Sequence, residues 1–394
     1  MKYKLLNILV FTVAVFSFSC SGRAEVSSHA PVVYERIDYV VPAKNRSFYM
    51  GFTPWSYDFT PEAKEAAYNI IDKHADMIAH YIDTGIPWPE ALEKKRFHSN
   101  VLKNIDGRVK PSQALKKGQK VYLALAPLSP NREKMARYWA KKNNQPLPSK
   151  WKNKEFDDPL VAEAYLNYCR YMIKRFNPDY LCYAIEANMA WESDKEPAFL
   201  KFIFFLERVY HTLKKENPSL PLFVSFSKNK KADRITHNKI NKKLLTVSDL
   251  VAVSTYPFFD QTGNEANPNY LRRDFFNTMA ALSSEKPFAV VETGYPAETI
   301  TIKKFLAKME KKGSARWQAD YVRFLLEESN RLNAEFVVWF FSRDFDAGWE
   351  KMKKAGMPIV ARAWRDTGLI DGKGKSRPAL TIWDAWLNIP VKTK

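Results

Sequence analysis

From about residue 46 onward, short apolar runs alternate with longer amphipathic stretches. Runs such as Phe288–Val291 and Phe336–Trp339 are apolar at every position, which is typical of strands buried on both faces. The alternation predicts repeated βα units and a parallel sheet. The expected strands are Ser47–Phe52, Asp76–His80, Lys120–Ala126, Tyr180–Glu186, Leu222–Ser227, Leu250–Tyr256, Phe288–Glu292 and Glu335–Phe341. Eight such units predict an α/β fold, a closed (β/α)8 or TIM barrel, with residues 46–394 as one domain.

The amphipathic stretches carry helix signals, and two connections between strand and helix are long. The clearest helix is expected from Asp158 to Phe176, because Asp158 can cap it and Pro159 suits its first position. The long connections are residues 127–157, after the third strand, and 342–377, after the eighth. In TIM barrels such loops lie at the C-terminal ends of the strands, where active sites are built. We therefore expect both loops to shape the site.

The first twenty residues have the pattern of an export signal. Lys2 and Lys4 precede an apolar run, Leu5–Phe18, that is too short for a permanent membrane span. Cys20 follows at the position of a lipidated cysteine, although Ser17 stands where a lipoprotein signal usually has Leu. We expect export and favour a surface or outer-membrane lipoprotein over a periplasmic or secreted protein. Residues 21–45 are then a tether and lead-in, and the lipid would be the only membrane contact.

The composition adds charge and aromatic surface to this picture. The net charge is +19, or about +17 without Lys2 and Lys4. A basic exported protein is drawn to anionic polysaccharides, although a solvated lysine-rich exterior gives the same count. No nucleic-acid signature is present, so nucleic acid is not an expected partner. The 11 Trp residues exceed ordinary core needs and suit sugar stacking. Cys169 and Cys182, on a helix and a strand, are expected to be buried free thiols.

Two of the expected strands end in a glutamate. Strand four ends at Glu186 and strand seven at Glu292, which places both carboxyl groups at the mouth of the barrel. A buried charge is costly unless it has a purpose. Retaining glycoside hydrolysis needs such a pair, with a carboxylic acid that protonates the leaving oxygen and a carboxylate that attacks the anomeric carbon. Salt-bridged residues at the rim of the barrel are the structural alternative.

The segments around these glutamates resemble clan A glycoside hydrolases, and most closely the family 53 endo-β-1,4-galactanases. Glu186 with Asn188 and Trp191 is similar to the acid/base strand of that family. Residues 248–258 are similar to its sixth-strand motif, and residues 290–296 to its nucleophile motif. The resemblance covers the second half of the barrel.

The resemblance implies roles for individual residues. Glu186 would be the acid/base and Glu292 the nucleophile. Tyr256 would lie close to the nucleophile, and Trp339 would be the platform under the sugar at the cleavage point. Tyr295, in the nucleophile motif, is a further expected substrate contact.

One position departs from the clan A pattern. These enzymes usually have Asn immediately before the acid/base, where it contacts the sugar 2-hydroxyl, and this chain has Ile185 there. Asn188 could take over that contact from the loop, and Trp191 is expected to bind substrate beside it. The substitution also leaves an altered substrate or a loss of activity open.

The first half of the barrel offers weaker candidates. Trp55 follows the first strand, and His80, Asp83 and Trp88 lie at or after the end of the second. Polar and aromatic groups so close to strand ends suit substrate contacts, although ordinary loop roles explain each equally well. The six His residues are scattered, without the spacing of a metal site, so we expect no metal and no cofactor.

The sequence therefore predicts a retaining β-glycosidase, acting as a monomer on an extracellular polysaccharide or oligosaccharide, with galactan-like chains as the first substrate to test. Two alternatives remain open. One is a surface lipoprotein that binds glycans without cleaving them, and the other is a clan A hydrolase for a different, anionic polysaccharide. A basic groove beside Glu186 and Glu292 would favour the second.

Overall fold

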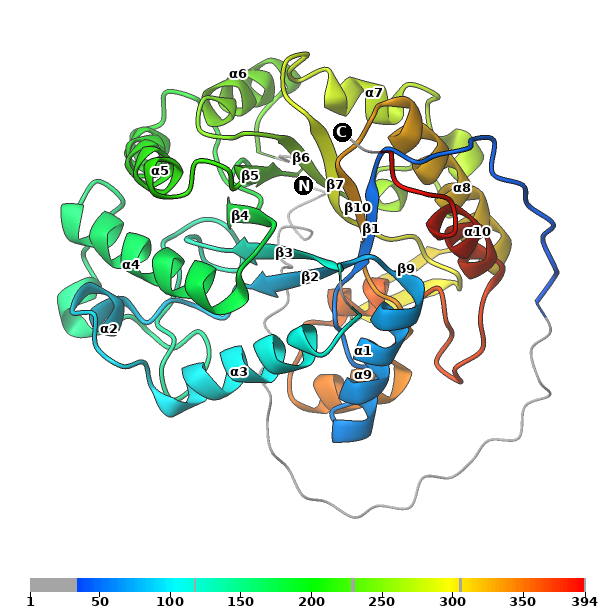
Figure 1. Cartoon of the computed structure of the whole chain (residues 1–394), viewed down its shortest axis with the longest axis horizontal. Helices are drawn as coiled ribbons and strands as arrows, with labels where there is room; N and C mark the ends of the chain where they lie inside the picture. The colour runs from blue at the N-terminus through cyan, green and yellow to red at the C-terminus, as the bar shows by residue number, and fades with distance from the viewer. Residues whose placement is uncertain (1–33, 117, 228–230, 305–306, 393–394) are drawn as a thin grey trace.

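The computed structural model describes residues 34–116, 118–227, 231–304 and 307–392. Eight parallel strands form a closed barrel in the order β1-β10-β7-β6-β5-β4-β3-β2 (Figure 1). These strands are β1 (Tyr49–Phe52), β2 (Met77–Ile82), β3 (Lys120–Leu125), β4 (Tyr180–Ala184), β5 (Leu222–Phe226), β6 (Val251–Thr255), β7 (Phe288–Thr293) and β10 (Phe336–Trp339). Each overlaps one expected strand, so the predicted TIM barrel is confirmed.

Helices surround the barrel, as Figure 1 shows. They are α1 (Pro61–His74), α2 (Trp88–Leu92), α3 (Ser99–Gln113), α4 (Pro159–Phe176), α5 (Pro197–Glu216), α6 (Arg234–Leu245), α7 (Phe275–Ala280), α8 (Ala315–Arg331), α9 (Asp346–Lys354) and α10 (Pro378–Leu387), with short 3-10 turns η1 (Ser149–Trp151), η2 (Pro257–Phe259), η3 (Pro268–Tyr270) and η4 (Ile359–Trp364). The expected helix is α4, in which the Asp158 side chain accepts a hydrogen bond from the backbone N–H of Leu160. It ends at Asn177, whose left-handed backbone (φ 44°) stops the helix.

The apolar residues form two cores, one inside the barrel and one between the strands and the helices. Successive side chains of a strand point to opposite faces, so each strand contributes to both cores. The inner core contains Met77, Ala79, Tyr122, Ala124, Phe223, Ala252, Ala289, Phe336 and Val338. Intervening residues such as Ile78, Val337 and Trp339 belong to the outer core.

Strands β4 and β7 each interrupt this alternation with a bulge. In the pairing of β6 with β7, Val253 faces Val290 but Ser254 faces Glu292, so Val291 is an extra residue in β7. The pairing of β4 with β5 has a similar irregularity between Cys182 and Ala184. Among the described barrel pairs, register shifts occur only where β4 or β7 takes part. The two bulged strands are those that lead to Glu186 and Glu292.

The loop after β7 contains a hairpin that the sequence pattern did not predict. Its strands are β8 (Ile300–Lys304) and β9 (Ala307–Lys311), and they pair antiparallel outside the barrel. The long loops were predicted correctly. The loop after β3 contains only η1 as regular structure, whereas the loop after β10 contains α9 and η4.

The lead-in residues from 34 onward pack on the barrel. The hydroxyl of Tyr39 donates to Glu327 on α8 and accepts from the indole of Trp386 on α10. The export signal and the lipidation of Cys20 fall outside the described residues. Within those residues, no helix is both long and apolar enough to cross a membrane. Cys169 and Cys182 are free and buried, as predicted.

Buried ion pairs hold the long loop after β10 in place. Arg377 and Asp344 are both fully buried, with Arg377 Nη1 donating to Asp344 Oδ1 at 2.8 Å and Nη2 lying 2.7 Å from Oδ2. Arg377 also donates to the carbonyl of Gly368 and to Glu298 on the loop after β7. The guanidinium thus ties together the two loops that follow β7 and β10.

Replacing Arg377 should therefore destabilise the fold. We expect Arg377→Met to lower the free energy of unfolding by about 3–5 kcal/mol, because Asp344 would stay buried without its partner. Chemical denaturation measures this change. The matched control is Arg331→Met, which breaks the exposed pair with Glu328 and should cost less than about 1 kcal/mol. Equal losses in the two variants would contradict the structural role assigned to Arg377.

Candidate active site

Glu186 and Glu292 line one cavity at the mouth of the barrel. The cavity has a volume of about 620 Å³ and extends from these carboxyl groups toward α6 and α7. Its wall near the two glutamates is formed by Ser254, Thr255 and Tyr256 at the end of β6. The bulge in β7 explains how Glu292 reaches it, because strict alternation after Val291 would turn Glu292 outward. Tyr81 donates a hydrogen bond to the carbonyl of Val291 and so braces the bulge from β2.

The environment of Glu292 favours its neutral form. Burial raises its pKa to about 8, and the nearby charge of Glu186 adds to the shift. Two contacts oppose it: the Tyr256 hydroxyl donates to Glu292 Oε1 at 2.5 Å, and the positive charge of Arg132 lies nearby. The site therefore retains a proton at neutral pH.

Glu186 is held by side chains from three other elements. Arg132 Nε donates to Glu186 Oε2 at 3.3 Å, and the Ser254 hydroxyl donates to Oε1 at 3.0 Å. The backbone N–H of Glu186 donates to the Ser225 hydroxyl on β5 at 2.8 Å. Glu186 is 7 % exposed and has a left-handed backbone (φ 49°). Both carboxyl oxygens thus have a protein partner.

A third carboxyl group completes the charged cluster. Asp83, just after β2, lies 3.7 Å from Arg132 Nη2 through its Oδ2 atom. Burial raises the pKa of Asp83 to about 6, against the opposing charge of Arg132. The guanidinium of Arg132 therefore faces the carboxyl groups of Asp83 and Glu186. Its charge also lowers the pKa of Glu292.

Aromatic rings form one side of the barrel mouth. The half-buried Trp55, after β1, stacks on Phe341 with 4.5 Å between the ring centroids. The centroids of Trp55 and Phe340 are 6.0 Å apart. Phe340 also contacts Tyr256, edge to face, at 6.4 Å. These rings connect the ends of β1, β6 and β10 beside Glu292. Of these rings, Tyr256 also lines the cavity.

The sequence of the second half of the barrel decides the family. Residues 135–383, more than half of the chain, match the model of glycosyl hydrolase family 53. The chain belongs to glycosyl hydrolase family 53. The matched residues include Glu186 and Glu292, and the resemblance stated from the sequence is confirmed.

Solved structures show the same fold. The Ignisphaera aggregans GH53 catalytic domain has a TM-score of 0.54 at 17 % identity, with 90 % of this chain and 99 % of that chain covered. GH5_18 from Streptomyces cattleya, in complex with GlcNAc, has a TM-score of 0.59 at 14 % identity, with 89 % and 83 % covered. An exo-beta-1,4-mannosidase from Opitutaceae bacterium strain TAV5 has a TM-score of 0.58 at 13 % identity, with 90 % and 60 % covered. No curated protein matches the chain.

The structure does not support every substrate contact that the sequence predicted. Trp339, the expected platform, is fully buried in the outer core, and its indole donates to the carbonyl of Thr367. The next residue, Phe340, is the one that meets Trp55 and Tyr256 at the mouth. The side chain of Trp339 therefore points away from the mouth, because an apolar run does not reveal which face of its strand is inside.

Two candidates from the first half of the barrel also point away from the cavity. His80 is fully buried on the outer face of β2, where it bonds to the Ser112 hydroxyl of α3. Burial lowers its pKa well below the usual value. Trp88 is fully buried against Trp151, and its indole donates to the carbonyl of Ala136. Both are structural side chains, and the expected substrate contacts are wrong.

The remaining candidates fix loops. The amide of Asn188 donates to the Ser227 carbonyl and to Asn241, so it joins the loop after β4 to the end of β5 and does not replace the missing Asn beside the glutamate. Trp191 is buried, and its indole donates to the carbonyl of Ala187. Tyr295 is buried with its ring stacked on a neighbouring tyrosine. These three are corrected from substrate contacts to supports of the site.

Sequence reasoning missed Arg132 and Ser254. Arg132 lies in the long loop after β3, and nothing in its neighbourhood distinguishes it from other basic loop residues. Ser254 precedes the expected contact Tyr256 by two residues, so alternation alone would have placed the two side chains on one face.

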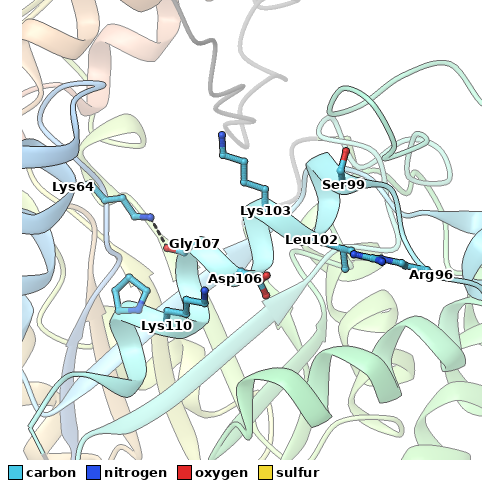
Figure 2. A pocket seen from close by; sticks show the side chains of 9 residues that line it. Lys64, Arg96, Ser99, Leu102, Lys103, Asp106, Gly107 and Lys110 are labelled. Carbon is cyan, nitrogen blue, oxygen red and sulfur yellow. Dashed lines mark hydrogen bonds between the residues drawn. The ribbon is translucent and has the colours of Figure 1, made fainter.

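A second hollow lies on the outside of the barrel. It has a volume of about 570 Å³ over α3, and Lys64, Arg96, Lys103 and Lys110 are among its lining residues. In Figure 2, Lys103 and Lys110 project from α3, while Lys64 reaches across from α1 and donates to the carbonyl of Gly107. A concentration of positive charge thus lies on the outer surface around α1 and α3, apart from the cavity of Glu186 and Glu292.

An acidic group elsewhere has its own counter-ions. Oxygen atoms of Glu298, Asp344 and Asp366 lie within 4.8 Å of one another, close enough to hold a metal ion. However, Arg377 pairs with the first two residues, and Arg362 pairs with Asp366 at 2.5 Å. The arginines account for this cluster as an ion-pair network.

The raised pKa of Glu292 predicts how stability depends on pH. Between its usual value of 4.5 and about 8, the folded state keeps a proton that the unfolded state has lost, so stability falls as the pH rises through this window. Glu292→Gln removes the titration and should raise Tm by about 2–4 °C at pH 8.5, as expected if about 1 kcal/mol is regained. At pH 4 the gain should be absent.

Differential scanning calorimetry at the two pH values checks this prediction. The control is Glu285→Gln, at an exposed position before β7, which should leave Tm unchanged at both. A gain for Glu292→Gln that is the same at pH 4 and pH 8.5 would show that ionisation of Glu292 is not its source.

Proposed function

We propose that this family 53 chain is a retaining β-glycosidase that cleaves an extracellular polysaccharide, with Glu186 as the acid/base and Glu292 as the nucleophile. The observation that carries the proposal is the pair of glutamates, each placed by a bulged strand at the edge of one cavity. Family and fold support an O-glycosyl hydrolase that acts on a carbohydrate. Galactan-like chains are the first substrate to test, because the sequence motifs resemble those of endo-β-1,4-galactanases.

The proposed reaction has two steps. In the first, Glu292 attacks the anomeric carbon while Glu186 gives its proton to the leaving oxygen, which forms a glycosyl ester on Glu292. In the second, Glu186 takes a proton from water, and the water oxygen displaces Glu292 from the sugar. The scheme needs the proton that burial favours on Glu292 to lie on Glu186 when substrate is bound. Tyr256 suits this scheme, because its hydrogen bond opposes the effect of burial and favours the ionised form of the nucleophile. Desolvation by substrate would strengthen every interaction in the site.

The charge around the cavity favours a neutral polymer over an anionic one. Arg234 and His237 on α6 line the cavity, but so do Glu186, Glu292 and Asp260. The cavity is therefore not a basic groove. Together with the basic hollow on α3, this distribution counts against the anionic alternative raised from the sequence.

One observation favours a second candidate function. The contact between Glu186 and Arg132 is the salt bridge expected of a surface protein that binds glycans without cleaving them. The presence of Ile185 in place of the usual Asn points the same way. Binding of a polysaccharide with no release of reducing ends, by the wild type and by Glu292→Ala alike, would establish this alternative.

The proposed location is the cell surface, through a lipid on Cys20. Labelling with a fatty-acid analogue should mark the wild type in cells and not the variant Cys20→Ser. Both proteins should still be exported, because the apolar run before the cysteine is unchanged.

Replacing either glutamate should separate the two chemical roles. On a polysaccharide that the wild type cleaves, Glu292→Ala should abolish the release of reducing ends, because no nucleophile remains. Glu186→Ala should lower kcat on the same polymer by about 10²–10⁴-fold, the usual contribution of a general acid. A reducing-end assay over a panel of neutral and acidic polysaccharides measures both effects. Glu285→Ala is the control, and full activity of Glu292→Ala would refute the assignment.

The aromatic side of the mouth gives an independent test. If Phe340 is a sugar platform, Phe340→Ala should raise KM on that polysaccharide, while Trp339→Phe should mainly lower Tm because Trp339 belongs to the outer core. A loss of about 1 kcal/mol of stacking corresponds to roughly a fivefold change in KM. A larger kinetic effect of Trp339→Phe than of Phe340→Ala would restore Trp339 as the platform.

A further inference from the structure

Arg132 is built into a tight hairpin that turns its side chain inward. Residues Leu128 and Met135 pair antiparallel across the turn, and the backbone N–H of Arg132 donates to the Ser129 carbonyl at 2.7 Å. The Ser129 hydroxyl accepts from the backbone N–H of Lys134, which closes the turn further. Arg132 is fully buried, and a buried guanidinium is costly unless it is paired. The loop therefore delivers a cation to the site at a fixed place.

The backbone conformations of Arg132 and Glu186 indicate that their contact has a functional role. Among the described residues, six other than glycine have a positive φ, and three of these are asparagines. Arg132 (φ 64°) and Glu186 (φ 49°) are two of the remaining three, and they contact each other. Unfavourable backbone conformations of this kind collect at functional sites, where surrounding structure enforces them.

The contacts of Glu186 treat its two carboxyl oxygens differently. Oε2 faces the Nε–H of Arg132, and a guanidinium has only donors. Oε1 faces the Ser254 hydroxyl, which can donate to a carboxylate or accept from a carboxylic acid. A proton on Oε2 would meet the N–H of Arg132 with no acceptor there, whereas a proton on Oε1 would meet one. Asp83 Oδ2 lies 3.7 Å from Nη2 of the same guanidinium, so its charge also faces Arg132.

We propose that Arg132, held by Asp83, is a positioning residue that keeps Oε2 of Glu186 unprotonated and makes Oε1 the atom that gives its proton to the leaving group. The inference rests on the proposed function for the identity of the acid, and adds which oxygen acts and what selects it. Because Arg132 acts through Glu186 and not on the sugar, its loss should affect steps in which the leaving group needs a proton more than steps in which it does not. The charge of Arg132 also acts on Glu292, and that effect is common to both kinds of step.

Leaving-group dependence tests this role. The substrates are the phenyl and 2,4-dinitrophenyl β-glycosides of the sugar released from the polysaccharide, since the second leaves without a proton. Arg132→Met should lower kcat/KM on the phenyl glycoside by about 10²-fold, within the range of general-acid catalysis, and have a clearly smaller effect on the dinitrophenyl glycoside, where only the loss of its charge near Glu292 counts. Arg132→Lys, which keeps a buried cation, should recover part of the loss. Equal losses on both substrates, or none on either, would overturn the proposal.

Two further measurements test the role of Arg132 independently of the Arg132→Met kinetics. Asp83→Asn keeps the shape of the side chain but not its charge, so it should show a smaller loss in the same direction. A crystal structure of Arg132→Met should show the Glu186 carboxyl group rotated or in two orientations, and a carboxyl group in its wild-type position would overturn the proposal. This second readout needs no turnover, so it separates failure of the inference from failure of the hydrolase assignment.

Discussion

The alternation of side chains in a closed barrel decides what this molecule can present at its mouth. Each strand residue points either to the barrel interior or to the helices, and no intermediate position exists. In β7, regular alternation would have sent Glu292 to the helices, and the extra residue Val291 brings it back to the interior. The hydroxyl of Tyr81 bonds to the carbonyl of that extra residue, so a neighbouring strand stabilises the irregularity. The same rule sends Trp339 outward and leaves Phe340 at the mouth.

Burying several carboxyl groups at the mouth of the barrel is energetically costly. A cation from the loop after β3 reduces that cost. Removing a partner from a buried charge typically costs about 3–5 kcal/mol, so Asp83, Glu186 and Glu292 could not all remain ionised without compensation. The structure combines two remedies. Arg132 pairs with Asp83 and Glu186, and burial raises the pKa of Glu292 to about 8, so that the cluster retains a proton. A site with one buried cation and a retained proton is suited to acid/base chemistry.

The fold could be predicted from the sequence because it follows from features that each segment carries alone. Eight apolar runs and the cap at Asp158 are local signals, and all of them reappear in the structure. The two glutamates were found because they end strands. Arg132 could not be found, because its role depends on a tertiary contact between a loop and the residue after β4. Such a contact produces no periodic pattern in the sequence. Trp339 and His80 were misplaced for a related reason, since apolar runs buried on both faces conceal their inward side, and bulges shift it.

Ile185 shows how one substitution changes what the site can bind. Its side chain belongs to the inner core with Tyr122 and Phe223, so it fills the barrel beneath Glu186 and does not line the cavity. In the clan A pattern this position supplies an amide for the sugar 2-hydroxyl, and an isoleucine has no group to replace it. Asn188 is committed to the end of β5, and the polar side chains that line the cavity include those at the end of β6, such as Ser254 and Thr255, and those of α6. Under the proposed function, a sugar bound here would be oriented more by aromatic stacking and by the carboxyl groups themselves than by an amide at position 185. Arg132, by fixing Glu186, would supply the rigidity that such a site needs.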